Sequence, residues 1–196
     1  MTNQQIQAIG NFLQYYYTDL HYIKKFQDFK EKNLSPKDYV SKEIGSFYSF
    51  LIEFRVTRNY LQGTTDKLLA ETIKWVNSRQ ANNVDSFTMR LLNSGLTRGN
   101  TTTSLASKIL FLNNPWEILP MDTLTRKAFN QTENQYSIYR TNLDNYRQTN
   151  KHIIDKCLSH TKALTSFVEK DYQGIINDLQ VIRENRMIDK LLWSTR

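Results

Sequence analysis

The sequence predicts an all-α protein, and three observations support this prediction. Apolar residues recur at alternating steps of three and four, which is the spacing of one face of an amphipathic helix. No segment alternates apolar and polar residues over a useful strand length. The 196 residues include six Gly and three Pro, too few for the many tight turns of an all-β fold. We therefore expect a compact multi-helix fold.

Four helices are expected in the first half of the chain, and three of them have a clear start signal. Ser, Thr and Asp accept hydrogen bonds from the free amides at a helix N-terminus, and Pro is favoured at the first helical position. The expected segments are about 6–32, then 36–54 opened by Ser35-Pro36, a helix reaching Val76 after Gly63-Thr64-Thr65-Asp66, and 87–92 capped by Asp85-Ser86.

The second half begins with a tight connection over residues 93–100 that contains two glycines. The Thr-rich stretch 101–104 supplies N-cap candidates for an apolar helix, and Asn113-Asn114-Pro115 ends that helix because Pro cannot continue it. The later expected segments are an apolar link over 116–121, a helix over 123–129 capped by Asp122, a long helix from about 134 past 150 and on to 158, and the segments 160–170 and 172–193.

The length of the chain is that of one domain, since domains commonly have roughly 100–200 residues. A hydrophobic fraction of 39% can fill a core of that size. We expect residues 1–196 to form a single helical domain, or two intimate helical subdomains that meet near residues 85–130.

The charge balance favours a polyanionic partner. The chain has 26 Lys and Arg against 19 Asp and Glu, a formal net charge of +7, and nucleic acid is the commonest polyanion that basic proteins bind. Within residues 88–152, eight basic residues stand against four acidic ones. We therefore expect a DNA-binding face in this third of the chain.

Cysteine and histidine usage argues against a metal or a cofactor. The single cysteine, Cys157, excludes a disulfide framework, a Cys-rich zinc site and a four-Cys iron–sulfur cluster, and we expect it in the core. His152 and His160 have a spacing that could place both on one helix face, but no carboxylate pair completes a metal-ligand set. We expect neither metal nor cofactor.

The sequence also predicts no contact with a membrane. No run of about 18 apolar residues is present, and the first ten residues lack the basic and apolar regions of a signal peptide. We expect a cytoplasmic protein, and the oligomeric state is left open. The sequence lacks a Walker loop and the GxGxxG, HExxH and GxSxG motifs, so it points to none of the enzyme classes that carry them.

The segment from Gly95 to Phe129 is the most distinctive part of the chain. It combines a glycine-bearing connection, an apolar helix and a Pro-Met-Asp element at the start of another helix. A connection with free backbone amides beside a helix N-terminus suits a phosphate group. The residues expected to hold a DNA phosphate there are Arg98, Gly99, Asn100, Thr101 and Thr102. Asp122 has two interpretations, an N-cap or a carboxylate beside a nucleotide-binding groove.

This segment resembles the helix-hairpin-helix DNA glycosylase superfamily, particularly its 8-oxoguanine-glycosylase-like bacterial members. In that family a hairpin precedes a helix, and a Pro-x-Asp element presents the catalytic Asp. The similar residues here are Pro120-Met121-Asp122, the helix 124–129 behind it, and the helix 104–111 before it. The resemblance implies a helix-hairpin-helix-like element, DNA as the partner, and excision of a modified or damaged base with Asp122 as the catalytic carboxylate.

A lysine bears on the type of glycosylase that the resemblance implies. Bifunctional members carry a Schiff-base Lys about 19 residues before the Asp, and that position falls here near Thr102-Thr103. Lys108 lies 14 residues before Asp122 and is our second candidate catalytic residue, with a DNA-phosphate contact or a plain surface lysine as alternatives. The resemblance therefore implies a monofunctional enzyme that uses Asp122 and a water molecule.

A glycosylase also needs a pocket for the base that leaves the stack. Trp116, Tyr136 and Tyr139 are the aromatic candidates for that pocket, and Arg126 and Lys127 are further DNA-binding candidates. The role would be repair or defence against modified phage DNA. Two alternatives stay open: a non-catalytic helical module that binds nucleic acid or protein, with Asp122 only a cap, and a purely structural partner protein.

Overall fold

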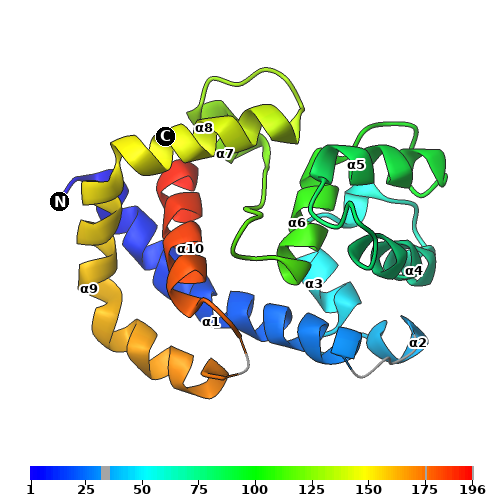
Figure 1. The fold of residues 1–196 in the computed structure, drawn as a ribbon, viewed down its shortest axis with the longest axis horizontal. Helices are drawn as coiled ribbons and strands as arrows, with labels where there is room; N and C mark the ends of the chain where they lie inside the picture. The colour runs from blue at the N-terminus through cyan, green and yellow to red at the C-terminus, as the bar shows by residue number, and fades with distance from the viewer. Residues whose placement is uncertain (32–35, 175, 196) are drawn as a thin grey trace. The chain divides into compact units, whose positions relative to one another are not determined.

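The computed structural model describes residues 1–31, 36–174 and 176–195, and their regular structure is entirely helical (Figure 1). The predicted all-α class is confirmed, since no strand occurs in these ranges. The α-helices are α1 Asn3–Glu31, α2 Pro36–Tyr39, α3 Phe47–Glu53, α4 Thr65–Val76, α5 Val84–Asn93, α6 Thr103–Asn113, α7 Thr123–Ala128, α8 Tyr136–Thr149, α9 Lys151–Glu169 and α10 Leu179–Trp193, with 3₁₀ helices η1 Thr57–Asn59 and η2 Lys170–Tyr172.

The chain divides into two compact units. Unit 1 consists of residues 1–20 and 121–196, so it combines both ends of the chain, and unit 2 consists of residues 21–120. The Gly95–Phe129 segment that the sequence singles out is thereby shared, with its first part in unit 2 and Asp122 in unit 1.

In unit 2, α5 packs mainly against α6, and α4 contacts both helices. The turn after α5 is closed by two backbone bonds, from the N–H of Gly95 to the carbonyl of Leu92 at 3.0 Å and from the N–H of Leu96 to the carbonyl of Leu91 at 3.2 Å. This is a Schellman motif, and Gly95 adopts the left-handed conformation that it requires, with φ of 66°. A helix pair is therefore present, joined by residues 94–102, and this connection opens with a tight turn.

The continuous helix expected over 36–54 is wrong, because the chain leaves the helix between α2 and α3. Gly45 has φ of 94°, and a Cβ placed on it would lie 2.7 Å from Nε2 of His21. Ser46 then caps α3 by accepting a hydrogen bond from the N–H of Ser49 at 3.1 Å. As a result Ile44, an apolar residue within the expected helix, is 85% exposed. Ser35, the expected N-cap, lies outside the described residues.

Two further helix boundaries differ from the prediction. Helix α5 begins at Val84 rather than after Asp85-Ser86, because the side chain of Asn83 is the N-cap and accepts from the N–H of Ser86 at 3.0 Å. The long helix expected from 134 to 158 breaks at Asn150, where φ is −111° and ψ is 15°. The carbonyl of Tyr146 accepts both the N–H of Asn150 at 2.9 Å and its side-chain amide at 3.1 Å, so Asn150 closes the end of α8.

Buried charge holds unit 1 together. Helix α10 packs against α7 and α9 (Figure 1), and Arg186 on α10 is 3% exposed at its side chain. Its Nε lies 2.6 Å from Oδ2 of Asp19 on α1, and its Nη1 lies 3.2 Å from Oδ2 of Asp189. Burial alone would lower the pKa of Arg186, but the two carboxylates outweigh burial and leave the pKa raised. The guanidinium therefore stays charged inside the unit.

A second buried group joins the same helices. Glu169, at the end of α9, accepts from Nε and Nη2 of Arg183 at 2.8 and 2.5 Å and from the hydroxyl of Tyr16 at 2.6 Å. Burial, followed by the bond to Glu169, raises the pKa of Tyr16, so its hydroxyl remains a donor. The two groups tie α1, α9 and α10 at separate points.

We predict that Arg186→Met lowers the free energy of unfolding by about 3–5 kcal/mol, because it leaves two carboxylates buried without their cation. Urea denaturation followed by circular dichroism measures the effect. Arg140→Met is the matched control, since the side chain of Arg140 is 41% exposed in a surface pair with Asp144, and it should cost at most about 1 kcal/mol. Equal losses in the two variants would contradict the prediction.

Candidate functional site

The Asp122 side chain is held in one orientation at the start of α7. Its Oδ1 accepts hydrogen bonds from the N–H groups of Leu124 at 2.8 Å and Thr125 at 3.0 Å. The hydroxyl oxygen of Thr125 in turn accepts from the N–H of Asp122 at 3.0 Å, which completes a capping box. The predicted cap is thus confirmed. Oδ2 makes no hydrogen bond to any described residue, and Asp122 is half-buried.

The two tyrosines expected in a base pocket lie in the core of unit 1. Tyr139 is fully buried, Tyr136 is nearly so, and their ring centroids are 5.7 Å apart. Burial, together with the charge of Asp189, raises the pKa of Tyr139, while its hydrogen bond with Thr125 acts in the opposite direction. Tyr139 therefore contacts the residue that completes the cap of Asp122. Neither ring faces solvent in this arrangement.

The two basic residues of α7 differ in their surroundings. Nη1 of Arg126 donates to the carbonyl of Thr132 at 2.7 Å, so this guanidinium closes the loop after α7. Lys127 is exposed, and no described residue forms an ion pair with it. Lys127 is thus the more available of the two cations expected to contact DNA.

In unit 2 the expected phosphate-binding residues lie in the connection between α5 and α6. Arg98, Gly99 and Asn100 are exposed at its tip. Gly99 has φ of 73°, and the hydroxyl of Thr97 donates to the carbonyl of Asn100 at 3.0 Å and closes the turn.

The same connection ends at the N-terminus of α6. Thr101 is exposed, and Thr102 occupies the N-cap position. The side chain of Thr102 makes no capping bond to α6, and its buried hydroxyl has no hydrogen-bond partner among the described residues. The expected phosphate-binding residues are therefore contiguous in unit 2, at the joint between the turn and α6.

One backbone contact ties a further segment to this connection. The N–H of Leu61 donates to the carbonyl of Leu96 at 2.9 Å, which ties the segment between α3 and α4 to the turn. Exposed arginines at positions 55 and 58 precede Leu61 in that segment. They are candidate phosphate contacts that sequence reasoning missed, because only the backbone bond between Leu61 and Leu96 relates segments so distant in sequence.

Lys108 has a structural partner. Its Nζ donates to the carbonyl of Phe54 at 3.0 Å, next to the C-terminus of α3, and the residue is half-buried. A cation at this position satisfies a carbonyl at a helix end and is favoured by the helix dipole. The ammonium of Lys108 is thus engaged within unit 2.

The aromatic candidate Trp116 belongs to unit 2 and is half-buried. Unit 2 also contains an open groove of about 430 Å³ between α4 and α5, which the sequence did not indicate. The groove is lined by Trp75, Gln80, Asp85, Ser86, Met89, Arg90 and Asn93. Trp75 in this groove is a second partly accessible tryptophan of unit 2, besides Trp116.

The structure gathers the predicted site residues into two sets. Unit 1 holds Asp122, Arg126, Lys127, Tyr136 and Tyr139. Unit 2 holds the contiguous set 98–102 together with Lys108 and Trp116.

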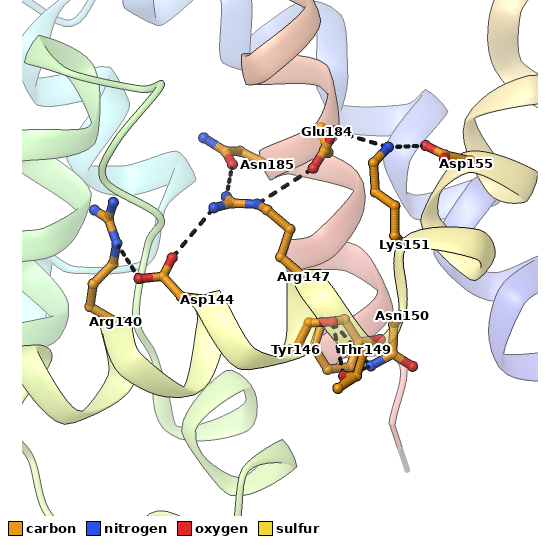
Figure 2. Close-up of polar contacts among 10 residues, drawn as sticks. All are labelled: Arg140, Asp144, Tyr146, Arg147, Thr149, Asn150, Lys151, Asp155, Glu184 and Asn185. Atoms are coloured by element: carbon orange, nitrogen blue, oxygen red, sulfur yellow. Dashed lines mark hydrogen bonds and ion pairs between the residues drawn. The ribbon is translucent and has the colours of Figure 1, made fainter.

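Several of the basic residues counted over residues 88–152 form ion pairs within unit 1. Figure 2 shows Arg147 reaching from α8 to α10, where its Nη2 donates to Oδ1 of Asn185 at 2.5 Å and its Nε lies 3.4 Å from Glu184. Arg147 also pairs with Asp144 of its own helix, and Lys151 pairs with both Asp155 and Glu184. These cations link α8, α9 and α10, so they are not free to form a basic face.

The net charge is distributed unequally over the two units. Residues 21–120 carry 14 Lys and Arg against 9 Asp and Glu, whereas the rest of the chain carries 12 against 10. The basic surplus is therefore mainly in unit 2, which also holds the α5–α6 connection.

No family model matches the chain, and neither the curated proteins nor the solved structures include a significant match. Among the described helices, none is both long and apolar enough to cross a membrane. Within the same residues, no three His, Cys, Asp or Glu side chains gather as the ligands of a metal ion would.

We predict that Asp122→Ala lowers the free energy of unfolding by about 1 kcal/mol, because α7 loses its capping acceptor, whereas Asp122→Asn leaves it nearly unchanged because Asn caps as well as Asp. Thermal and urea denaturation of the three proteins measure the difference. A loss in Asp122→Asn as large as that in Asp122→Ala would show that the negative charge, rather than the capping bonds, stabilises this helix start.

Proposed function

We propose that the chain is a DNA N-glycosylase of the helix-hairpin-helix type, which removes a modified or damaged base by hydrolysis with Asp122 as the catalytic carboxylate. The observation that carries the proposal is the hydrogen bonding of the Asp122 side chain. Two amides fix its Oδ1, while Oδ2 has no hydrogen bond from the described residues. The packed α5–α6 pair, whose connection opens with a tight glycine turn, supports the proposal, because the resemblance implies a helix-hairpin-helix-like element shortly before the Asp.

Base excision suits a carboxylate of this kind. Breaking the N-glycosidic bond develops positive charge on the sugar, and the negative charge of a nearby carboxylate stabilises it. The bond electrons leave with the base, and a water molecule oriented by the carboxylate adds to the anomeric carbon while its proton moves to the carboxylate or to the departing base. A side chain already held in one rotamer needs little reorganisation during this step.

The partners of Lys108 favour hydrolysis over lyase chemistry. A Schiff-base lysine must present a neutral amine to the sugar carbon. The Nζ of Lys108 instead donates to the carbonyl of Phe54 at 3.0 Å, so this amine is directed at the end of α3. This supports a monofunctional enzyme.

DNA binding is assigned in this proposal to the α5–α6 connection of unit 2. Arg98 is exposed at its tip, and Arg58 is exposed in the segment that Leu61 ties to Leu96. Neither arginine forms an ion pair with a described residue. Unpaired cations beside exposed backbone suit the phosphates of a duplex.

A second candidate function is a non-catalytic helical module that binds nucleic acid. The specific observation in its favour is that the capping box gives Asp122 a complete structural role. This alternative shares the DNA contacts of the first and differs only in the chemistry, so a single experiment separates the two.

We expect Asp122→Asn to bind DNA as the wild type does and to release base at least about 100-fold more slowly, since one well-placed electrostatic group contributes about that factor. Base release is measured on duplexes that carry oxidised, alkylated, deaminated or modified-cytosine bases. Glu133→Gln is the matched control, because Glu133 is an exposed carboxylate in the loop after α7, and it should react at the wild-type rate. If Asp122→Asn releases base at the wild-type rate, Asp122 has no part in the mechanism. If the wild-type protein binds DNA but releases base from none of these duplexes, the protein is the non-catalytic module.

We expect the double variant Arg58→Ala, Arg98→Ala to bind an unmodified duplex more weakly and to lower the slope of log K against log salt concentration by about two, close to 0.9 for each phosphate that the protein no longer neutralises. Titrations at several salt concentrations provide the slope. Arg79→Ala is the control, since Arg79 is an exposed arginine of unit 2 between α4 and α5, and its slope should match the wild type. An unchanged slope in the double variant would place the DNA-binding surface elsewhere.

A further inference from the structure

Helix α9 has two faces of different character. Its inner face is buried in unit 1 and includes Ile154, Cys157, Thr161, Thr165 and Glu169. On the outer face, exposed residues recur at steps of three and four and form a stripe along the helix. We name this set, which Lys170 continues just past the end of α9, the α9 stripe: His152, Lys156, His160, Leu164, Phe167 and Lys170.

The centre of the α9 stripe is apolar. Leu164 is 56% exposed and Phe167, one turn further along, is 72% exposed. Single exposed apolar residues are common on protein surfaces. Two large ones at a spacing of three lie side by side on a helix and offer one continuous anchoring point. Nζ of Lys170 lies 5.9 Å from the ring centroid of Phe167, so a cation borders this point directly.

The charges around this centre are predominantly positive. No described residue forms an ion pair with Lys156 or Lys170. Within α9, Asp155 pairs with Lys151 and Glu169 with Arg183, so the one carboxylate that borders the stripe without a described ion pair is Asp171, next to Lys170. An apolar centre bordered by unpaired cations has the pattern of a protein interface with a polar rim.

We infer that the α9 stripe is a docking site for an acidic, apolar segment of a partner protein. Apolar side chains of the partner pack on Leu164 and Phe167, and its carboxylates pair with Lys156 and Lys170. Lys156 lies about 16 Å from Phe167 along the helix and Lys170 about 4.5 Å, at a rise of 1.5 Å per residue. The partner's acidic residues therefore flank its apolar anchors on both sides.

Other occupants fit the α9 stripe less well. A single-stranded nucleic acid would find one ring, Phe167, and two lysines, but it would leave the aliphatic Leu164 uncovered, whereas an apolar peptide side chain covers it. A second copy of this chain brings the same surplus of cations to the interface. The inference is independent of the proposed glycosylase activity, because the stripe shares no residue with the Asp122 cap or the α5–α6 connection.

The test selects ligands without prior bias. Displayed random peptides of about 16 residues, roughly four helical turns, are selected on the full-length protein and counter-selected on the Leu164→Ala, Phe167→Ala double variant. We expect the retained peptides to be net negative and to contain aliphatic or aromatic anchors. Recovery of no peptide, or of peptides without acidic residues, overturns the inference.

Binding of the synthesised peptides is then measured by fluorescence anisotropy. We expect Leu164→Ala, Phe167→Ala to weaken binding at least about tenfold, equivalent to 1.4 kcal/mol. The charge-reversal variant Lys156→Glu, Lys170→Glu should also weaken it, with the difference from wild type shrinking as salt increases.

Val181→Ala is the matched control, because Val181 is an exposed apolar residue of unit 1 on α10, and its affinity should equal that of the wild type. Wild-type affinity in the Leu164→Ala, Phe167→Ala variant would overturn the inference. Phosphatidylserine vesicles and an oligothymidylate are tested in parallel. If the vesicles or the oligothymidylate bind in a way that depends on Phe167, the inferred acidic protein partner is wrong and the α9 stripe binds a membrane or a single strand instead.

Discussion

The buried ion pair between Asp19 and Arg186 is the interaction on which unit 1 depends. It joins α1 to α10, two helices separated by most of the chain, and it places a charge where only a matched carboxylate makes burial tolerable. Helix α7 packs on α10, and Asp122 caps α7. The packing of α7 in unit 1 therefore rests on a helix that is tied to the other end of the chain, whereas the orientation of the Asp122 carboxylate rests on its local cap.

Charge pairing changes what the basic composition means. Counted along the sequence, residues 88–152 look like a basic face, yet Arg140 pairs within α8, and Arg147 and Lys151 form ion pairs that link α8 and α9 to α10. The surplus left for a polyanion lies mainly in residues 21–120. A formal net charge therefore indicates the class of partner without locating the surface that binds it. Pairing in three dimensions decides that location.

Local interactions were predictable from the sequence, and tertiary ones were not. The cap of Asp122 and the end of α6 before Pro115 involve residues within three or four positions of each other, so the sequence indicates both. The break at Gly45 depends on His21, which packs where a Cβ would otherwise lie. The burial of Tyr139 likewise depends on distant helices. A sequence pattern specifies which face of a helix is apolar, but it does not specify what that face will contact.

The capping role of Asp122 and its proposed catalytic role are compatible for a physical reason. The cap uses only Oδ1, as acceptor for two amides, and leaves Oδ2 without a bond from the described residues. The amides that satisfy the helix start also immobilise the carboxylate, and an immobile charge stabilises a developing cation better than a mobile one. Because these bonds are local, a short Pro-Met-Asp element is sufficient to build this part of a site. A base pocket cannot be built from one short segment, since its walls must come from segments that only folding brings together.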